Sequence, residues 1–355
     1  MDEIVIRTGT DLANDVDGLL ADCREVFMVY DANAGGCAEK IQAVLSARGN
    51  LVSSCSIVTS EENKSIATVL QLVDWMLRYD AGRDALLLAV GGGITTDMAG
   101  FAASVYKGGI RFAFVPTTLL SQVDAAIGGK TGVNFEDYKN MIGVIRQPEF
   151  TYINPRVLDT LPYRDFVSGS AEMLKTFIIS GGEDYSKAVE VLSGIFMSGS
   201  REEAVETAGP SLQELVMAAA RIKAGIAGRD QYEGGERRKL NLGHTFGHAV
   251  EWEARRKKLD ITHGEAVAVG MVQAARLACA IEPDSQEFYA SLRRDLTGCG
   301  LPVDFPFPLD SLGEAMRKDK KAEGGKVHFV LPFGVGDVRI VDMSVDDAID
   351  KLEGR

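Results

Sequence analysis

The segment ALLLAV at 85–90 constrains the fold of this chain more than any other. It is an uninterrupted apolar run of strand length, which is typical of a strand buried on both faces of a parallel sheet. A glycine turn and a helical pattern follow it. Further strands are predicted at 25–31, 56–58 and 111–115, and helices at 37–48 and 66–81. Strands that alternate with helices predict a parallel sheet with crossover helices.

The second half of the sequence has a different pattern. From about Pro162 to Cys299 there is almost no alternation of β-branched residues, and amphipathic helical stretches such as 211–227 and 264–281 dominate. Two short strands are predicted later, at 327–332 and 337–341. A chain of 355 residues also exceeds what one hydrophobic core commonly holds. We therefore predict an α/β domain over 1–160 and a mostly helical domain over 161–355.

The net charge of −13 narrows the range of partners. Nucleic-acid binding needs basic surface, so a nucleic-acid partner is not expected. An anionic small substrate suits an acidic chain only if lysines and arginines gather in one pocket. No apolar run reaches the length of a membrane span, and the first residues do not resemble a signal peptide. Five scattered cysteines without a CxxC pattern predict buried free thiols in a reducing compartment, the cytoplasm.

Three glycines, Gly91, Gly92 and Gly93, stand between the buried strand and the next helix. Glycine lets a backbone approach a ligand closely, and the N–H groups at a helix N-terminus bind phosphate. The spacing is not that of G-x-G-x-x-G, so that fingerprint does not apply, and an ordinary strand-to-helix turn is an equal alternative. Asp31 ends another predicted strand, where it is placed either to bind ribose hydroxyls or to form a turn.

Three of the four histidines lie within 20 residues, at His244, His248 and His263. His244 and His248 are four apart and share a helical face, and a helix pair would bring His263 back beside them. Imidazoles with a carboxylate suit zinc and similar metals, so the cluster favours a metal site over a coincidence of surface residues. Spacing alone does not identify the remaining protein ligand.

Several lysines stand beside small or polar residues, away from the charge-alternating faces of predicted helices: Lys130, Lys139, Lys175 and Lys223. A single lysine of this kind is commonly solvated. Several together are what an anion pocket in an acidic chain requires. GGKTGVN at 128–134 is not a P-loop, because its spacing differs and no predicted strand precedes it.

The ordered motifs of the chain resemble the dehydroquinate synthase family, within the wider sugar phosphate cyclases. They run from about 25 to 335 and include VGGGITTDMAGFAA, VPTTLLSQVDAAIGGKTGVN, YKNMIG, LDTLP, GSAEMLK, DQYEGGERRKLNLGHTFGHAVE, HGEAV and DKK. The resemblance implies an N-terminal parallel-sheet α/β domain that binds NAD and a C-terminal helical domain that binds a metal. It also implies a cytoplasmic homodimer that acts in the shikimate pathway of aromatic amino acid biosynthesis.

The resemblance also assigns residue roles. The implied metal ligands, for zinc or alternatively cobalt, are Glu172, His244 and His263. The implied NAD pocket consists of Asp31, Asn33, Glu61, Lys64, Gly92, Gly93, Asp97, Thr117, Thr118, Lys139 and Thr160. The implied substrate and catalytic residues are Asp124, Lys130, Asn140, Lys175, Lys223, Glu233, Arg237, Asn241, His248 and Lys320 or Lys321. His248 is thereby a substrate residue and not a ligand, which revises the simple pairing of His244 with His248.

The implied reaction converts 3-deoxy-D-arabino-heptulosonate 7-phosphate to 3-dehydroquinate and phosphate. A hydride passes to NAD, phosphate is eliminated, the hydride returns, the ring opens and an intramolecular aldol reaction closes the carbocycle. NAD ends unchanged in this lyase reaction. Two alternatives remain open: a cyclase that forms an inosose or valiolone from another sugar phosphate, and a metal-dependent polyol dehydrogenase, which would release NADH stoichiometrically.

One segment departs from the family pattern. Ahead of VPTTLL the family reads Tyr-x-Arg-Gly, and its arginine reaches the substrate phosphate, often from the neighbouring subunit. This chain has Gly108 at that position. Glycine cannot replace a guanidinium. The hypothesis is that Arg111, or else Lys107, compensates; the alternatives are a weaker phosphate grip or a different sugar phosphate.

Overall fold

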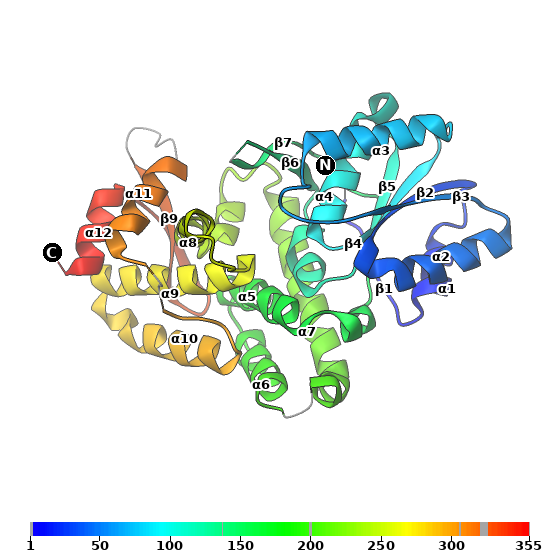
Figure 1. The fold of residues 1–355 in the computed structure, drawn as a ribbon. Coiled ribbons are helices and arrows are strands. Elements are labelled where there is room, and N and C mark those ends of the chain that lie inside the picture. Colours follow the sequence, from blue (N-terminus) through cyan, green and yellow to red (C-terminus); the bar gives the residue numbers. More distant parts are fainter. Residues whose placement is uncertain (1–2, 137, 199–200, 305–306, 320–325, 355) are drawn as a thin grey trace. The chain divides into compact units, whose positions relative to one another are not determined.

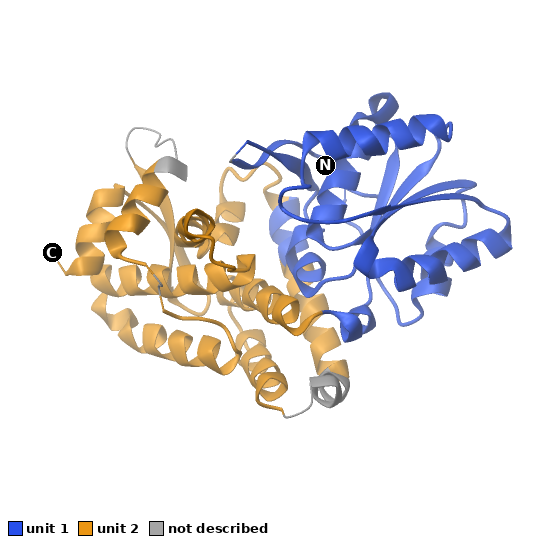
Figure 2. Ribbon diagram, in the orientation of Figure 1, with its two compact units in different colours: residues 1–161, 223–228 blue, residues 162–222, 229–355 orange. Residues whose placement is uncertain are grey.

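The computed structural model describes residues 3–136, 138–198, 201–304, 307–319 and 326–354. The chain divides into two compact units (Figure 2). Unit 1 comprises residues 1–161 and 223–228, and unit 2 comprises residues 162–222 and 229–355. Residues 223–228, which the sequence-based division placed in the second domain, group with unit 1.

Unit 1 is built on a six-stranded sheet with the order β1-β8-β5-β4-β2-β3, in which all neighbouring strands are parallel (Figure 1). The strands are β1 (Ile6–Thr8), β2 (Glu25–Asp31), β3 (Leu51–Ile57), β4 (Leu86–Gly91), β5 (Arg111–Pro116) and β8 (Thr151–Ile153). The helices are α1 (Leu12–Leu19), α2 (Gly35–Arg48), α3 (Ile66–Arg78) and α4 (Gly93–Val105). The predicted parallel α/β architecture is confirmed.

The central strand β4 is buried along its whole length, as its apolar run predicted. Alternate residues of a strand point to opposite faces of the sheet. Leu87 and Ala89 accordingly belong to a core with residues of α3 and α4, while Leu86 and Leu88 belong to a second core with residues of α1 and α2. Helices therefore cover both faces of the sheet.

An antiparallel ribbon of β6 (Lys130–Phe135) and β7 (Tyr138–Ile145) was not predicted. The predicted strand at 56–58 is also longer than expected, because β3 covers Leu51–Ile57. Both segments are partly exposed and rich in polar residues or glycine, so neither shows the apolar run of a buried strand. β1 and β8 have three residues each, too few for a periodic pattern.

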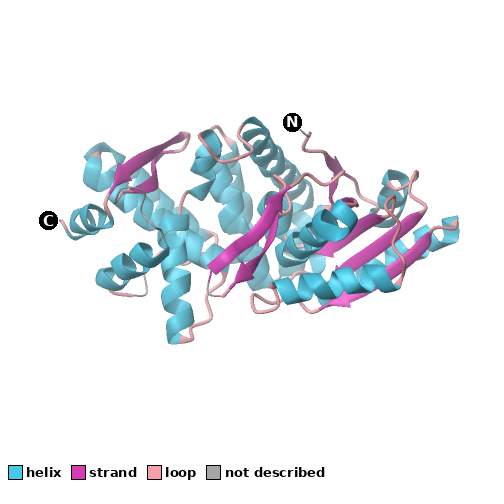
Figure 3. Cartoon of the chain, turned by 90° about the horizontal axis from the view of Figure 1, so that it is seen from above, coloured by secondary structure: helices cyan, strands magenta, loops and turns pink. Residues whose placement is uncertain are grey.

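Unit 2 is mostly helical, as predicted, and carries one antiparallel strand pair (Figure 3). Its helices are α5 (Tyr163–Ser180), α6 (Asp184–Met197), α7 (Arg201–Arg229), α8 (His244–Lys257), α9 (His263–Ile281), α10 (Gln286–Gly298), α11 (Leu309–Asp319) and α12 (Val345–Glu353). Its strands are β9 (Val327–Gly334) and β10 (Asp337–Met343). Only α9 among the described helices is long and apolar enough to cross a membrane, but 72% of that window is buried inside the structure, which is typical of a core helix.

Glycines let α9 approach α5 and α8 closely. A Cβ atom on Gly264 would lie 1.8 Å from the backbone oxygen of Ser168 in α5. A Cβ on Gly270 would lie 2.0 Å from the backbone oxygen of Gly243, the residue that precedes α8. No side chain fits at either contact, so glycine at these positions sets the distance between the three helices.

Candidate metal centre and substrate residues

Glu172, His244 and His263 come together inside unit 2 from three different helices. Glu172 lies in the buried middle of α5, His244 is the first residue of α8 and His263 the first of α9. Glu172 Oε1 is 3.6 Å from His244 Nε2 and 3.3 Å from His263 Nε2. One potential ligand atom from each residue lies within 4.8 Å of the others. The predicted metal ligands are thus neighbours in space.

The other ring nitrogen of each histidine is occupied. His244 Nδ1 donates to the backbone oxygen of Leu242 at 3.2 Å, and His263 Nδ1 donates to Glu251 Oε1 at 3.1 Å. A proton held on Nδ1 leaves the Nε2 lone pair of a neutral imidazole free to bind a metal. Sequence reasoning missed Glu251, although its position seven residues after His244 places it near the same helical face.

At Glu172 and at His263, burial and the neighbouring charges shift the pKa in opposite directions. Burial acts to raise the pKa of the Glu172 carboxyl, but Lys175 and the two histidines hold it well below its usual range. Burial and the Lys175 charge lower the pKa of His244 to about 3. Burial also disfavours charge on His263, yet the nearby Glu172 carboxylate and the hydrogen bond to Glu251 raise its pKa to about 10. His244 is therefore neutral near pH 7.

The donor set fits a divalent cation. Lys175 Nζ forms an ion pair with Glu172 Oε2, but among the described residues no hydrogen bond of ordinary geometry reaches either Glu172 oxygen. A fully buried carboxylate in this state lacks part of the stabilisation that buried charges commonly have. Two imidazole nitrogens and one carboxylate are also a common protein set for catalytic zinc, which keeps a further position open.

His248 lies beside this cluster but outside it. Its ring is 5.5 Å from that of His244, centre to centre, and the two rings meet edge to face. The group of potential ligand atoms instead takes His263 from α9. The pairing of His244 with His248 as metal ligands, which their spacing first suggested, is therefore not the one that the helices assemble.

The loop between α7 and α8 contains three predicted substrate residues, Arg237, Glu233 and Asn241. The Asp230 carboxylate accepts hydrogen bonds from the backbone N–H groups of Gly234, Gly235 and Arg237 at 2.7–2.9 Å. The side chain of Arg237 is buried and donates to the backbone oxygen of Gln231 at 2.8 Å.

Glu233, the second of these residues, has a left-handed backbone with φ of 60°. Its carboxylate accepts a hydrogen bond from the third, Asn241. A non-glycine residue in this conformation is uncommon, and such residues are found at functional sites more often than elsewhere.

In unit 1, predicted nucleotide residues follow the carboxyl ends of neighbouring strands. Asp31 ends β2, and its carboxylate accepts hydrogen bonds from Asn33 N at 2.8 Å and from Thr59 Oγ1. Gly92 is the N-cap of α4 and Gly93 its first residue, directly after β4, and Thr117 and Thr118 follow β5. Parallel sheets commonly bind ligands at this edge.

The glycines between β4 and α4 are required by packing. A Cβ on Gly91 would lie 2.5 Å from Thr95 Oγ1, and a Cβ on Gly93 would lie 2.8 Å from the Cβ of Ala125. Gly92 has φ of −76°, so the backbone conformation does not demand glycine there. No side chain caps the N-terminus of α4, whose first N–H groups therefore face outward from the helix end. The turn supports both alternatives drawn from the sequence.

Two buried lysines form ion pairs among the predicted residues of unit 1. Lys64 Nζ lies 2.5 Å from both Asp97 Oδ2 and Asn140 Oδ1. Lys223 Nζ donates to the Asp124 carboxylate at 2.5 Å and to its backbone oxygen at 2.7 Å. Burial raises the pKa of Asp97, and the charge of Lys64 opposes this shift.

The remaining predicted residues are more exposed. Lys139 lies 3.7 Å from the Glu61 carboxylate, Lys130 begins β6 with an exposed side chain, and Thr160 donates to the backbone oxygen of Val157 at 3.5 Å. Lys320 and Lys321 lie outside the described residues. Among the described residues, the lysines and arginines that are buried are Lys64, Lys175, Lys223 and Arg237. All four had been selected from the sequence.

The turn at 106–109 does not support compensation by Arg111. Arg111 Nε and Nη2 bind the Glu149 carboxylate, and Nη2 also lies 3.1 Å from Asp22 Oδ2. Arg111 begins β5, at the opposite end of the strand from Thr117. Lys107 Nζ donates to the backbone oxygen of Ala81 at 2.5 Å. In the described structure both cations are therefore engaged by groups of unit 1.

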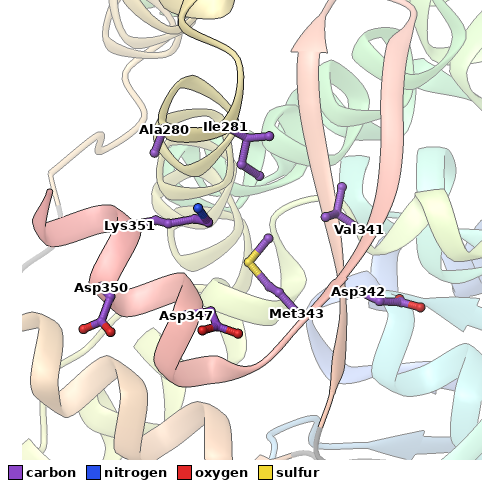
Figure 4. Close-up of a pocket in the computed structure, with 8 residues that line it drawn as sticks. All are labelled: Ala280, Ile281, Val341, Asp342, Met343, Asp347, Asp350 and Lys351. Carbon is purple, nitrogen blue, oxygen red and sulfur yellow. The ribbon is translucent and has the colours of Figure 1, made fainter. Parts of the chain in front are cut away.

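One further surface hollow has none of the predicted site residues among its described lining residues. A shallow hollow of about 530 Å³ lies between the end of α9, β10 and α12 (Figure 4). Ile281, Met343 and Lys351 are among its lining residues.

Of the five cysteines only Cys23 and Cys299 are buried, while the other three are half-buried, so the prediction of buried thiols is only partly correct.

The sequence matches one family over most of its length. The model described as 3-dehydroquinate synthase N-terminal matches residues 54–168, and the model described as 3-dehydroquinate synthase C-terminal matches residues 169–322. A 3-dehydroquinate synthase from Nostoc sp. is 39% identical over 311 residues, which cover 87% of this chain and 83% of the relative. One from Acidithiobacillus ferrooxidans is 38% identical over 340 residues, which cover 93% and 89%.

Solved structures of related proteins share the fold. A 2-epi-5-epi-valiolone synthase from Streptomyces hygroscopicus, with NAD⁺ and Zn²⁺ bound, has a TM-score of 0.83 and 29% identity, and covers 100% of this chain and 98% of its own. A 2-deoxy-scyllo-inosose synthase complexed with carbaglucose-6-phosphate, NAD⁺ and Co²⁺ has a TM-score of 0.85 and 23% identity, with 98% and 96% covered. The likeness to the second shows the fold alone. The family suggested by the motifs is confirmed, and this chain belongs to the 3-dehydroquinate synthase family.

Proposed function

We propose that this chain converts 3-deoxy-D-arabino-heptulosonate 7-phosphate to 3-dehydroquinate and phosphate as an NAD- and metal-dependent lyase. Family membership supports the reaction, since relatives that cover most of the chain are 3-dehydroquinate synthases. The observation that carries the proposal is the grouping of Glu172, His244 and His263 around one point, with both Nδ1 atoms already bonded.

Glu172, His244 and His263 would hold the metal, zinc or cobalt; the solved valiolone synthase contains Zn²⁺ and the inosose synthase contains Co²⁺. When bound, the metal lowers the pKa of adjacent substrate hydroxyls and NAD takes up and returns a hydride. Glu251 and the Leu242 carbonyl fix the tautomer and orientation of the two imidazoles. Lys175 keeps the Glu172 carboxyl ionised, which is the state that binds a cation.

The NAD pocket is proposed at the carboxyl edge of the sheet in unit 1. Asp31 would bind ribose hydroxyls, and the uncapped N-terminus of α4 at Gly92 and Gly93 would bind the pyrophosphate. Lys64 and Asp97 form a buried pair near this edge. We assign Asn33, Glu61, Thr117, Thr118, Lys139 and Thr160 to the same pocket on the resemblance.

Buried cations would bind the anionic groups of the substrate. Burying a lysine or arginine is costly unless it is paired, so retained buried cations mark functional sites more often than stability. Lys175, Lys223 and Arg237 are all buried. We propose that these residues orient the carboxylate and phosphate. Asp124, Lys130, Asn140, Glu233, Asn241 and His248 are proposed as further substrate residues.

A cyclase that acts on another sugar phosphate is the second candidate. The valiolone synthase is 29% identical over the whole of this chain. Gly108 also removes an arginine that the family pattern provides, and neither Arg111 nor Lys107 is placed to replace it. Assays with each sugar phosphate distinguish the two candidate functions, because the protein should release phosphate rapidly only from its own substrate.

Glu172→Gln tests the metal site. A neutral amide is a poorer metal ligand than a carboxylate, so zinc affinity should fall at least about tenfold and phosphate release should fall with it. Zinc bound to purified protein is measured by elemental analysis and by competition with a chromophoric chelator. Glu253→Gln is the matched control, because Glu253 is also fully buried in unit 2 but lies outside the cluster. Equal zinc affinity in wild type and Glu172→Gln would refute the assignment.

A further inference from the structure

Three residues of α5 form a stripe spaced by four: Arg164, Ser168 and Glu172. Residues four apart lie on one face of a helix. This stripe faces the start of α9, and α5 and α9 pack against each other within unit 2 (Figure 1). Only Glu172 belongs to the proposed metal site.

Each member of the stripe contacts one of the first three residues of α9, in antiparallel order. Glu172 Oε1 lies 3.3 Å from His263 Nε2. Ser168 Oγ accepts a hydrogen bond from the backbone N–H of Gly264 at 3.0 Å. Arg164 Nε donates to Glu265 Oε1 at 3.1 Å, and Nη2 donates to Oε2 at 2.9 Å.

Arg164 forms a bidentate ion pair with Glu265 and also contacts Asp260. Paired hydrogen bonds between a guanidinium and a carboxylate fix orientation as well as distance. The same guanidinium binds the carboxylate of Asp260 and donates to its backbone oxygen at 2.5 Å. Arg164 thus ties the first turn of α5 both to α9 and to the loop that precedes His263.

Glu265 connects the Arg164 ion pair to the backbone around His263. Its Oε2 accepts a hydrogen bond from the backbone N–H of Thr262 at 2.7 Å, and Thr262 Oγ1 accepts one from Glu265 N at 3.3 Å. This reciprocal capping box fixes the backbone on both sides of His263. A shift of Glu265 would therefore move the imidazole with it.

We propose that Arg164 and Ser168 are positioning residues of the metal centre. The stripe sets the separation and axial register of α5 and α9, and hence the distance between the Glu172 carboxylate and His263 Nε2. The inference rests on the proposed metal site. Groups that orient metal ligands from outside commonly change affinity by about 10- to 100-fold when removed.

The test compares Arg164→Ala with Arg339→Ala. Arg339 is the matched control, because its side chain is also 44% exposed and also pairs with two acidic residues, Asp337 and Glu282, of which Glu282 caps the other end of α9. Zinc and cobalt affinities of the metal-free proteins are measured by competition titration, together with the melting temperature. Arg164→Ala should weaken metal binding about tenfold or more, whereas Arg339→Ala should stay within about twofold of wild type at a similar loss of melting temperature.

Two milder variants keep the test decisive if Arg164→Ala does not fold. Arg164→Lys keeps the charge but loses the two-pronged geometry, and Ser168→Ala removes only the hydroxyl that accepts from Gly264 N. Both should weaken metal binding. Wild-type affinity in these variants, or equal weakening in Arg339→Ala, would overturn the inference. Absence of metal binding by wild type would instead overturn the proposed metal site itself.

Discussion

His244 and His263 face the same carboxylate but differ in their preferred charge. His244 is bonded to a backbone carbonyl, and burial with the nearby Lys175 charge lowers its pKa to about 3. Against the effect of burial, the carboxylates of Glu172 and Glu251 raise the pKa of His263 to about 10. Burial and the Lys175 charge thus favour the neutral form of His244, whereas the two neighbouring carboxylates favour the charged form of His263.

Arg111→Ala tests the hypothesis that Arg111 compensates for the arginine absent at Gly108. If Arg111 bound the substrate phosphate, its removal should raise KM by at least about tenfold. Because the guanidinium is bound to Glu149 and Asp22, we expect KM for the heptulosonate phosphate to stay within about twofold. Loss of these partly exposed pairs should reduce the free energy of unfolding by about 1 kcal/mol. Steady-state kinetics and urea denaturation measure both quantities, and a large rise in KM would reinstate the hypothesis.

At the scale of elements, the close approach of α9 to its neighbours creates the metal centre. Three helices contribute one residue each, and two of those residues are the first of their helices. Gly264 and Gly270 allow the backbone contacts that bring these helix ends together. The site therefore depends on helix packing as much as on the ligands themselves.

Gly264→Ala should break this packing. A Cβ would lie 1.8 Å from the Ser168 backbone oxygen, so the helices must separate, at a cost of about 3 kcal/mol in the free energy of unfolding. Metal affinity should fall as well. Gly194→Ala in α6 is the control, because nothing lies within 4 Å of its added methyl and helix propensity should stabilise it by about 0.5–1 kcal/mol. Urea denaturation compares the two, and equal stabilities would contradict the packing argument.

The sequence predicted features that are encoded within one short segment better than features that depend on contacts between segments. The apolar run of β4 and the turn after it were readable, because a strand buried on both faces has few polar residues. The partly exposed strand β3 and the β6–β7 ribbon lacked that signal. Spacing paired His244 with His248, and a helix pair was expected to bring His263 beside them. Which two of the three histidines share the Glu172 carboxylate depends on contacts between helices that spacing does not encode. Glu172 entered only through the family resemblance.

At the scale of the whole molecule, the buried lysines and arginine described in this acidic chain all belong to the proposed NAD, metal or substrate residues. The net charge is −13, yet Lys64, Lys175, Lys223 and Arg237 are buried among the described residues. Each of the three lysines pairs with a carboxylate: Lys64 with Asp97, Lys175 with Glu172, and Lys223 with Asp124. Buried paired cations of this kind occur at functional sites as well as in structural ion pairs.

We expect this protein to eliminate phosphate from its substrate and to use NAD without consuming it. The most direct measurement incubates the purified protein with 3-deoxy-D-arabino-heptulosonate 7-phosphate, a small amount of NAD and zinc, and follows phosphate, NADH absorbance and the carbocyclic product. We expect many phosphates released per NAD, no net rise in NADH and 3-dehydroquinate as the product. Stoichiometric NADH would place the chain among the dehydrogenases, and release of phosphate only from a different sugar phosphate would contradict the proposed substrate.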